Sequence, residues 1–124
     1  MLKFKLIVSK GILVLAPEHA LQAADFAALS SVVDDYLSTH DTLKGVLIHT
    51  KKFPGWHDFA GLMAHMQFVR AHHRFVEKIA LATDTIVADV ARVIVGRFIH
   101  AKIKHFQYAD DEPALHWLED NTAS

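Results

Sequence analysis

Cysteine, long apolar runs and an excess of charge of one sign are all missing from this sequence. Without cysteine the chain has no disulfide, no thiol nucleophile, no iron–sulfur cluster and no cysteine-type zinc site. Its 13 Lys and Arg residues against 14 Asp and Glu residues leave a net charge of -1, so no overall positive field attracts nucleic acid. No apolar stretch approaches the roughly 20 residues that a membrane-spanning helix requires. These absences favour a globular protein without a nucleic-acid partner.

Glycine and proline are also scarce, with 5 and 3 residues, whereas 52% of the 124 residues are hydrophobic. This composition excludes the disordered and fibrous classes, and the length is that of one domain. No linker, repeat or low-complexity stretch divides the chain, so we expect a single domain over residues 1–124. At its start, Lys3 and Lys5 interrupt the apolar positions with the period of a half-exposed strand, unlike a secretory signal. The sequence therefore predicts a cytoplasmic location.

Apolar periodicity predicts an α/β domain with the element order ββαβαβαβα. Strands are expected over 3–8, 11–16, 44–50, 76–83 and 102–106, and helices over 21–38, 57–72, 84–95 and after residue 112. The first two strands form a hairpin in which Gly11 takes a positive φ, and Asp25 falls on the solvated face of the first helix. Alternating strands and helices in the second half imply parallel, right-handed crossovers. We expect a mixed sheet of about five strands flanked by four main helices.

Four segments, in their order and spacing, resemble one family. They are the opening hairpin, Phe53-Pro54-Gly55-Trp56 before the second helix, Glu77-Lys78-Ile79-Ala80-Leu81 before Asp84, and Ala114-Leu115-His116-Trp117-Leu118 near the end. Over almost the whole chain the sequence resembles the SpoIIAA-like proteins, a branch of the STAS fold (sulfate-transporter and anti-sigma-factor-antagonist domains). The resemblance implies a STAS domain, similar in shape to the CRAL-TRIO lipid carriers. It also implies the lipophilic-ligand binding and membrane association that have been proposed for the family.

One departure from the wider STAS group concerns regulation. Phosphorylated antagonists of that group carry a Ser or Thr where the third strand runs into the second helix. Here residues 51–56 contain no hydroxyl, and Thr50 lies just before them. The resemblance therefore does not imply a phosphate switch of that kind.

Ten histidines raise the question of a metal site. Two helical ligands of one ion must be three or four residues apart, whereas His65 and His72 are separated by roughly 10 Å along a helix axis. His100 and His105 point to opposite faces of one strand. We therefore expect surface or boundary histidines and no metal, and no other cofactor is indicated.

Catalytic motifs are missing as well. The sequence has no nucleophile elbow, no phosphate-binding loop and no dinucleotide fingerprint. The adjacent acids Asp34-Asp35 and Asp110-Asp111-Glu112 fall on a solvated helix face and at a helix start. We expect no catalytic residues, although an enzyme could still arise from groups that the fold brings together.

The loop before the second helix combines two cations with two large aromatic residues. Lys51, Lys52, Phe53 and Trp56 lie within six residues. Ammonium groups meet anionic lipid while aromatic rings enter the headgroup boundary, so this composition is typical of a membrane interface. We expect these four residues to contact a membrane surface peripherally, at the inner face.

The second helix is apolar over a wide face, and its methionines suit an adaptable pocket. The sequence predicts a site for a lipophilic small molecule between the second helix, the third helix and the sheet, with the second helix as a moving lid. The predicted lining is Phe59, Leu62, Met63, Met66, Val87, Val90 and Ile94.

Three alternatives stay open. The apolar residues of the second helix could be ordinary core, with Trp56 folded inward. The chain could instead be a regulatory protein–protein interaction module of the anti-sigma-factor-antagonist type, docking a partner through the second helix and the loop before it. Finally, Ile86 and Val93 lie outside the main apolar face of the third helix, and such surplus surface favours a homodimer.

Overall fold

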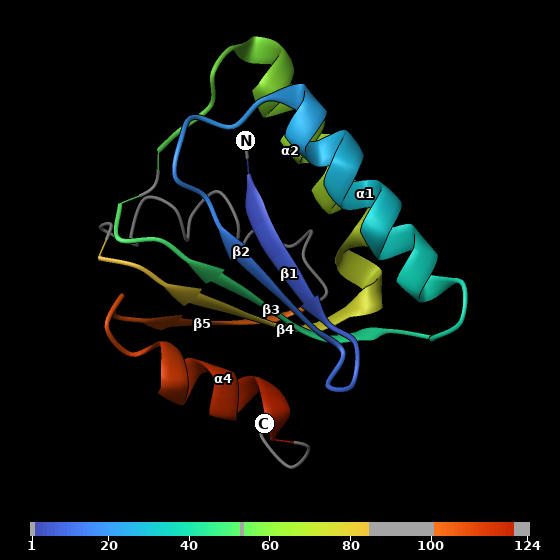
Figure 1. Cartoon of the computed structure of the whole chain (residues 1–124), viewed down its shortest axis with the longest axis vertical. Helices are drawn as coiled ribbons and strands as arrows, with labels where there is room; N and C mark the ends of the chain where they lie inside the picture. Colours follow the sequence, from blue (N-terminus) through green and yellow to red (C-terminus); the bar gives the residue numbers. More distant parts are fainter. Residues whose placement is uncertain (1, 53, 85–100, 121–124) are drawn as a thin grey trace.

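In the computed structural model, which describes residues 2–52, 54–84 and 101–120, five strands form one sheet in the order β1-β2-β3-β4-β5 (Figure 1). The strands are β1 (Lys3–Ile7), β2 (Ile12–Ala16), β3 (Leu43–His49), β4 (Val76–Ala82) and β5 (Lys102–Phe106). β1 and β2 pair antiparallel as the expected hairpin, with Gly11 at φ 66, and every later pair is parallel. The predicted mixed sheet of five strands is therefore confirmed, with β5 as one of its edges.

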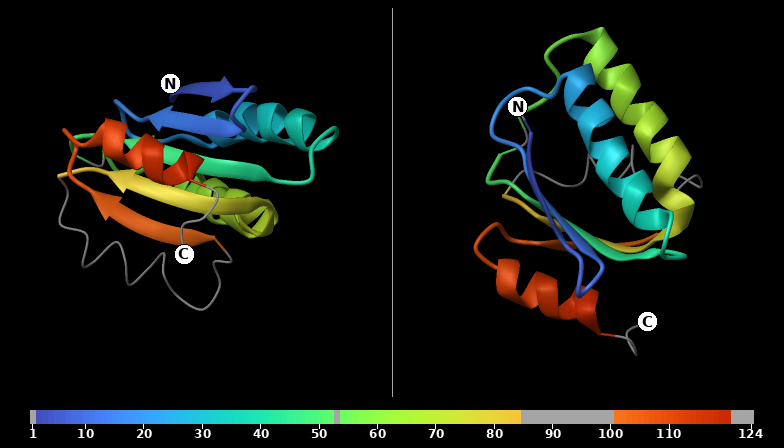
Figure 2. Two further views of the ribbon diagram at one scale, coloured as in Figure 1. Left: turned by 90° about the horizontal axis from the view of Figure 1, so that it is seen from below. Right: turned by 45° about the vertical axis from the view of Figure 1, so that its right-hand side comes forward.

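The described helices cover both faces of this sheet. They are α1 (Ala23–Leu37), α2 (Phe59–His72) and α4 (Asp111–Glu119), and the short 3-10 helix η1 (His73–Phe75) follows α2 directly. Both crossovers from β2 to β4 advance in the same direction across the sheet, so right-handed connections place α1 and α2 on one face. α4 lies on the other face (Figures 1 and 2). Of the four expected helices, the one over 84–95 falls outside the described residues.

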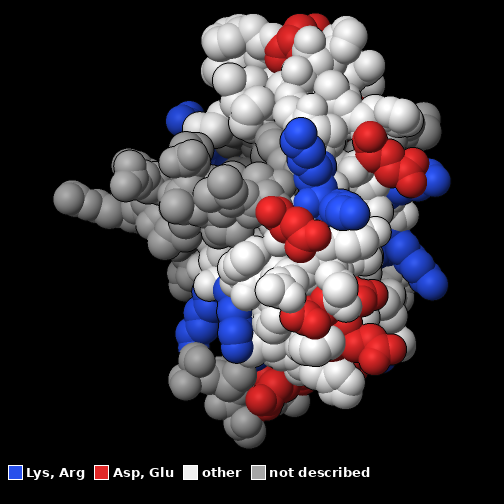
Figure 3. All heavy atoms as spheres, turned by 90° about the vertical axis from the view of Figure 1, so that its left-hand side faces the viewer, with Lys and Arg blue, Asp and Glu red and all other residues white. Residues whose placement is uncertain are grey.

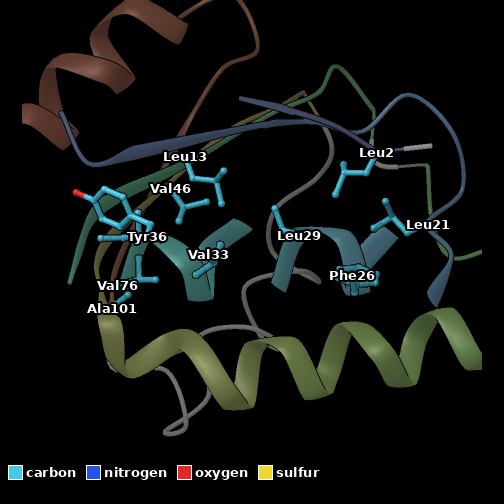
Figure 4. Close-up of a cluster of buried hydrophobic side chains, with 11 residues drawn as sticks. Leu2, Leu13, Leu21, Phe26, Leu29, Val33, Tyr36, Val46, Val76 and Ala101 are labelled. Carbon is cyan, nitrogen blue, oxygen red and sulfur yellow. The ribbon is translucent and has the colours of Figure 1, made fainter. Parts of the chain in front are cut away.

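Two hydrophobic cores follow from this arrangement. The larger one lies between the sheet and the α1 side, and Figure 4 shows side chains from the strands and from α1 meeting there. Its buried members are Leu2, Leu13, Leu21, Phe26, Leu29, Val33, Tyr36, Leu43, Val46, Val76 and Ala101. The smaller core lies between the sheet and α4, and it consists of Ile12, Leu47, Ala80, Ala82, Ala114 and Leu118.

The helices begin at slightly different residues from those that the sequence predicts. α1 begins at Ala23 rather than at residue 21, because Gln22 is its N-cap in a capping box with Asp25. α2 begins at Phe59 rather than at residue 57, because the Asp58 side chain accepts the Gly61 N–H at 2.9 Å. α4 begins at Asp111, which still leaves Pro113 in the first turn, where a missing N–H breaks no helical bond.

The expected position of Asp25 on the solvated face of α1 is wrong. Asp25 is buried, and its carboxylate accepts the backbone N–H groups of Leu2 and Gln22, both at 2.9 Å. A carboxylate is buried at low cost only when donors surround it, and here two amides do so. Asp25 thus joins the start of the chain to the start of α1.

Candidate functional site

α2 carries apolar side chains on two opposite faces. Its inner face packs on α1, where Ala64 and Phe68 contact the larger core and the rings of Phe26 and Phe68 lie 6.0 Å apart. On the opposite side Phe59, Met63 and Met66 share one face, because they are spaced four and three residues apart. Their exposed fractions are 74% for Phe59, 42% for Met63 and 50% for Met66. We call these three residues the outer apolar face of α2.

Close backbone contact fixes the start of α2 against the segment before α1. Gly61 is buried, and a Cβ atom on it would lie 2.5 Å from the carbonyl oxygen of Leu21. Only glycine permits this approach, which explains a glycine in a helix interior, where it normally costs stability. Leu21 also pairs with Trp56 in an isolated parallel bridge, through hydrogen bonds from Leu21 N to Gly55 O and from His57 N to Leu21 O, each 2.8 Å long.

A cluster of three rings joins this loop to α1 and α2. The indole N–H of Trp56 donates to Nδ1 of His65 at 3.0 Å, and the His65 ring stacks on Phe26 with centroids 4.8 Å apart. Burial lowers the pKa of His65 below its ordinary value. Trp56 itself is 39% exposed, so the indole is neither fully folded inward nor fully presented to solvent.

His72 holds the other end of α2 to α1. Its Nε2 lies 2.8 Å from Oδ1 of Asp34, and its Nδ1 lies 2.8 Å from the carbonyl oxygen of Phe68. Both partners are hydrogen-bond acceptors, so each contact needs a proton on the ring nitrogen that makes it. The expectation of surface or boundary histidines is wrong for His72, which is buried, because Asp34 and a helix carbonyl provide its polar partners.

The loop cations lie at the surface while their backbone is tied down. Lys51 and Lys52 are exposed. The Lys51 carbonyl accepts the Asp84 N–H at 3.0 Å, and the Lys52 carbonyl accepts the Thr50 hydroxyl at 3.1 Å. Phe53, the fourth predicted membrane contact, lies outside the described residues.

Thr50 is the hydroxyl nearest to the position where phosphorylated STAS antagonists carry theirs. It is buried, and its single hydroxyl proton is shared between the Lys52 carbonyl oxygen and the Pro17 carbonyl oxygen, which lies 3.2 Å away. Because the side chain is buried and its proton is directed at backbone carbonyl oxygens, the hydroxyl is not presented to a kinase. The side chain therefore serves to fix the loop before α2.

The predicted lipophilic pocket is only partly within the described structure. Phe59, Met63 and Met66 form the outer apolar face, and Leu62 is partly buried on its flank. Val87, Val90 and Ile94 lie outside the described residues, so the pocket stays a prediction. A depression of about 420 Å³ lies elsewhere, at the end of α1. Its lining residues are Asp34, Leu37, Ser38, His40, Asp41 and Phe75.

The charges near this site do not form a field of one sign. Figure 3 shows that the upper end of the molecule, where α2 begins in Figure 1, is mostly uncharged on the side in view. Acidic and basic groups lie close together lower down on the same side.

Among the residues that the structure describes, no three His, Asp or Glu side chains are grouped so as to hold a metal ion.

Sequence reasoning missed the residues that orient α2. The spacing of seven residues excludes His65 and His72 as ligands of one metal ion, but it also places both on one helix face, where they can pack on a neighbouring element. Gly61 gave a usable signal, since a glycine inside a helix often marks a close contact. No local signal identifies Leu21 as the partner of Trp56, because the two residues are 35 positions apart in the sequence.

A family model described as SpoIIAA-like matches residues 12–119, from β2 to the end of α4. The match includes α2 and the loop before it, and it leaves β1 outside. Neither the curated proteins nor the solved structures contain a significant match to this chain. Within the described residues, no helix has both the length and the apolarity to cross a bilayer.

Proposed function

The chain belongs to the SpoIIAA-like family of STAS domains, and on that basis we propose that it is a regulatory protein–protein interaction module that docks a partner protein through the outer apolar face of α2. This is a role of the anti-sigma-factor-antagonist type without the phosphorylated hydroxyl. The observation that carries the proposal is the exposure of Phe59, Met63 and Met66 on one face of a helix whose opposite face is already packed. Adjacent exposed apolar side chains of this size are typical of interaction surfaces.

The residue types of this face also suit a protein partner. Aromatic residues and methionine are enriched at protein interfaces, and an unbranched methionine adapts its shape to the partner. The face belongs to a helix that is anchored at both ends, through Gly61 against Leu21 and through His72 against Asp34. A surface that is held in place before binding loses less conformational entropy when the partner arrives.

Regulation through the loop does not need phosphorylation under this proposal. Thr50 is buried with its hydroxyl within hydrogen-bond distance of two backbone carbonyl oxygens, and residues 51–56 contain no hydroxyl. The partner would therefore sense the shape and polarity of α2 and its loop rather than a phosphate. A loop with exposed Lys51 and Lys52 favours a partner surface with acidic groups beside an apolar groove.

The test uses paired variants of the full chain. Phe59→Asp with Met66→Asp places two charges on the outer apolar face, and Phe75→Asp changes an exposed aromatic residue away from it. A captured partner is identified, purified and recombined with the chain, and the dissociation constant is measured for each variant. The proposal predicts a one-to-one complex that the double variant weakens at least about tenfold and the control leaves unchanged. Equal partner affinity of the double variant and the Phe75→Asp control contradicts the proposal, and so does the failure of the purified components to form a complex.

Lipophilic-ligand binding with peripheral membrane association is the second candidate. The observation that favours it is the presence of exposed Phe59, Met63 and Met66 on a helix that follows exposed Lys51 and Lys52. Basic residues next to an apolar helix face favour binding to an anionic lipid surface. Under this hypothesis the chain co-sediments with phosphatidylglycerol vesicles but not with phosphatidylcholine vesicles. The double variant Lys51→Gln with Lys52→Gln no longer distinguishes the two kinds of vesicle. Solvent extraction of the purified protein then yields a bound lipid by mass spectrometry.

A second copy of the chain would be a third occupant of the same face. Light scattering across a concentration series distinguishes it from the other two. A dimer that Phe59→Asp converts to a monomer, in the absence of lipid and of other proteins, would assign the face to self-association. The docking proposal predicts that the isolated chain stays monomeric.

A further inference from the structure

We propose that Trp56 and His65 form a pH-sensitive latch, in which protonation of the His65 ring releases the indole of Trp56 from α2. The latch consists of one hydrogen bond, from the indole N–H of Trp56 to Nδ1 of His65, with a length of 3.0 Å. It goes beyond the docking role proposed above and does not depend on it. Because the bond joins the loop before α2 to α2 itself, its state changes how the Trp56 side chain is held on the helix.

The chemistry of the two rings makes this bond depend on protonation. An indole N–H can only donate, so Nδ1 of His65 must accept, and the single ring proton of the neutral histidine lies on Nε2. A second proton can bind only at Nδ1. It would place two N–H donors opposite each other at 3.0 Å, and the hydrogen bond would be lost. The latch is therefore closed for neutral His65 and open for the cation.

The surroundings of His65 set the pH range of the latch. Burial lowers the pKa of the ring below its ordinary value of 6.5, since a buried cation loses its hydration. The stacked ring of Phe26 presents a π face that favours a cation, but burial acts in the opposite direction and determines the shift. The latch therefore stays closed at neutral pH and opens below pH 6.5.

The titratable groups on the elements around His65 are already engaged or exposed. On α1, Asp25 binds the amides of Leu2 and Gln22, and Asp34 contacts His72. In the loop, Asp58 accepts the Gly61 N–H, and three further groups, Lys51, Lys52 and His57, are exposed. Within the described residues, no hydrogen bond or ion pair joins the His65 ring to a charged side chain.

The backbone of the loop is held independently of the latch. Hydrogen bonds from Leu21 N to Gly55 O and from His57 N to Leu21 O, each 2.8 Å long, contain no titratable group. Protonation therefore breaks the hydrogen bond between the indole and His65 and leaves the loop paired with the segment before α1. The same proton also affects stability: since the folded state binds it less readily than the unfolded state, stability is complete above pH 6.5 and declines as pH falls from 6.5 through the lowered pKa.

The experiment follows the indole N–H signals of the two tryptophans by NMR in the nitrogen-15-labelled full chain, from about pH 8 to about pH 5. Trp56→Phe assigns the signals, and Trp117 on α4 is the internal reference. We expect the Trp56 proton to shift upfield, with the same midpoint as the His65 ring and below pH 6.5. The Trp117 signal stays constant.

Two variants keep the test decisive. In His65→Gln an amide oxygen replaces the ring acceptor and does not titrate, so the Trp56 signal becomes independent of pH. In His57→Gln the exposed neighbour of Trp56 is removed, and the titration of Trp56 is unchanged. A Trp56 signal that still titrates in His65→Gln, or that stays constant while His65 becomes protonated, overturns the proposal. Joint loss of both indole signals would show global unfolding and would equally contradict a local latch.

Discussion

The two faces of the sheet use their apolar residues differently. α4 lies directly on one face of the sheet (Figure 2), and Ala80, Ala114 and Leu118 are completely buried between them. On the other side α2 packs on α1, and it leaves Phe59, Met63 and Met66 at the surface. On the α4 side these apolar side chains are buried in the smaller core, whereas α2 has large apolar side chains that are not buried in either described core. That surplus is the reason for placing the functional surface on α2.

The two tryptophans repeat this difference on a smaller scale. Trp117 lies in α4 between Phe106 and Lys78, with the Lys78 ammonium 5.1 Å from the ring centroid. Trp56 lies in a loop and donates to a histidine whose pKa burial lowers. The contacts of Trp117 involve Phe106 and Lys78, whereas those of Trp56 include a histidine, the residue type whose ordinary pKa lies nearest to neutral pH. A structural contact and a switchable one thus coexist in one small domain.

The largest expected effect on stability is that of a truncation on the α4 side, compared with a truncation on the α2 side. Leu118→Ala leaves a cavity against the sheet and should lower the free energy of unfolding by about 2–5 kcal/mol. Met66→Ala removes an exposed side chain and should change it by less than about 0.5 kcal/mol. Urea unfolding followed by far-UV circular dichroism measures both. Equal losses would mean that the two helices are packed alike, and the contrast between the faces would disappear.

Periodicity was sufficient to predict most of the fold. The strand pattern of β1 to β5 and the helical spacing of α1, α2 and α4 are local properties of the sequence, and their boundaries differ from the prediction by a few residues at most. Contacts between distant segments were not predictable. Asp25 looked like a solvent-facing acid because nothing near it in the sequence shows that the Leu2 amide, 23 positions away, will be its partner.

The candidate site was predictable in composition but not in orientation. Hydropathy identifies α2 as apolar over more surface than one neighbour covers, yet it cannot decide which side faces α1. His65 and His72 lie toward the inner face. Their rings can do so because Trp56 hydrogen-bonds to His65 and Asp34 to His72. A pattern based on hydrophobicity places histidine outside, so the polar partners that reverse this assignment become visible only in three dimensions.

A smaller effect is expected from the lysine beneath α4. Lys78 is buried, and its ammonium donates to the carbonyl oxygens of Trp117 at 2.9 Å and of Asp120 at 2.6 Å. Lys78→Met keeps most of the volume but removes these charged hydrogen bonds at the end of the helix, which should cost about 1–3 kcal/mol. Lys104→Met is the matched control, because Lys104 is exposed beside the same ring. A loss in the control as large as in Lys78→Met would show that charge near Trp117, rather than burial, stabilises α4.

The smallest expected effect on stability is that of a substitution on the outer apolar face of α2. Phe59 is the most exposed residue of the outer apolar face, so Phe59→Ser should change the free energy of unfolding by less than about 0.5 kcal/mol. The measurement is repeated at several protein concentrations. A loss above about 1.5 kcal/mol, comparable to unburying an aromatic side chain, would mean that Phe59 is covered in solution. If that loss grows with concentration, a second copy covers it; if it does not, the chain itself does, and the docking surface would have to lie elsewhere.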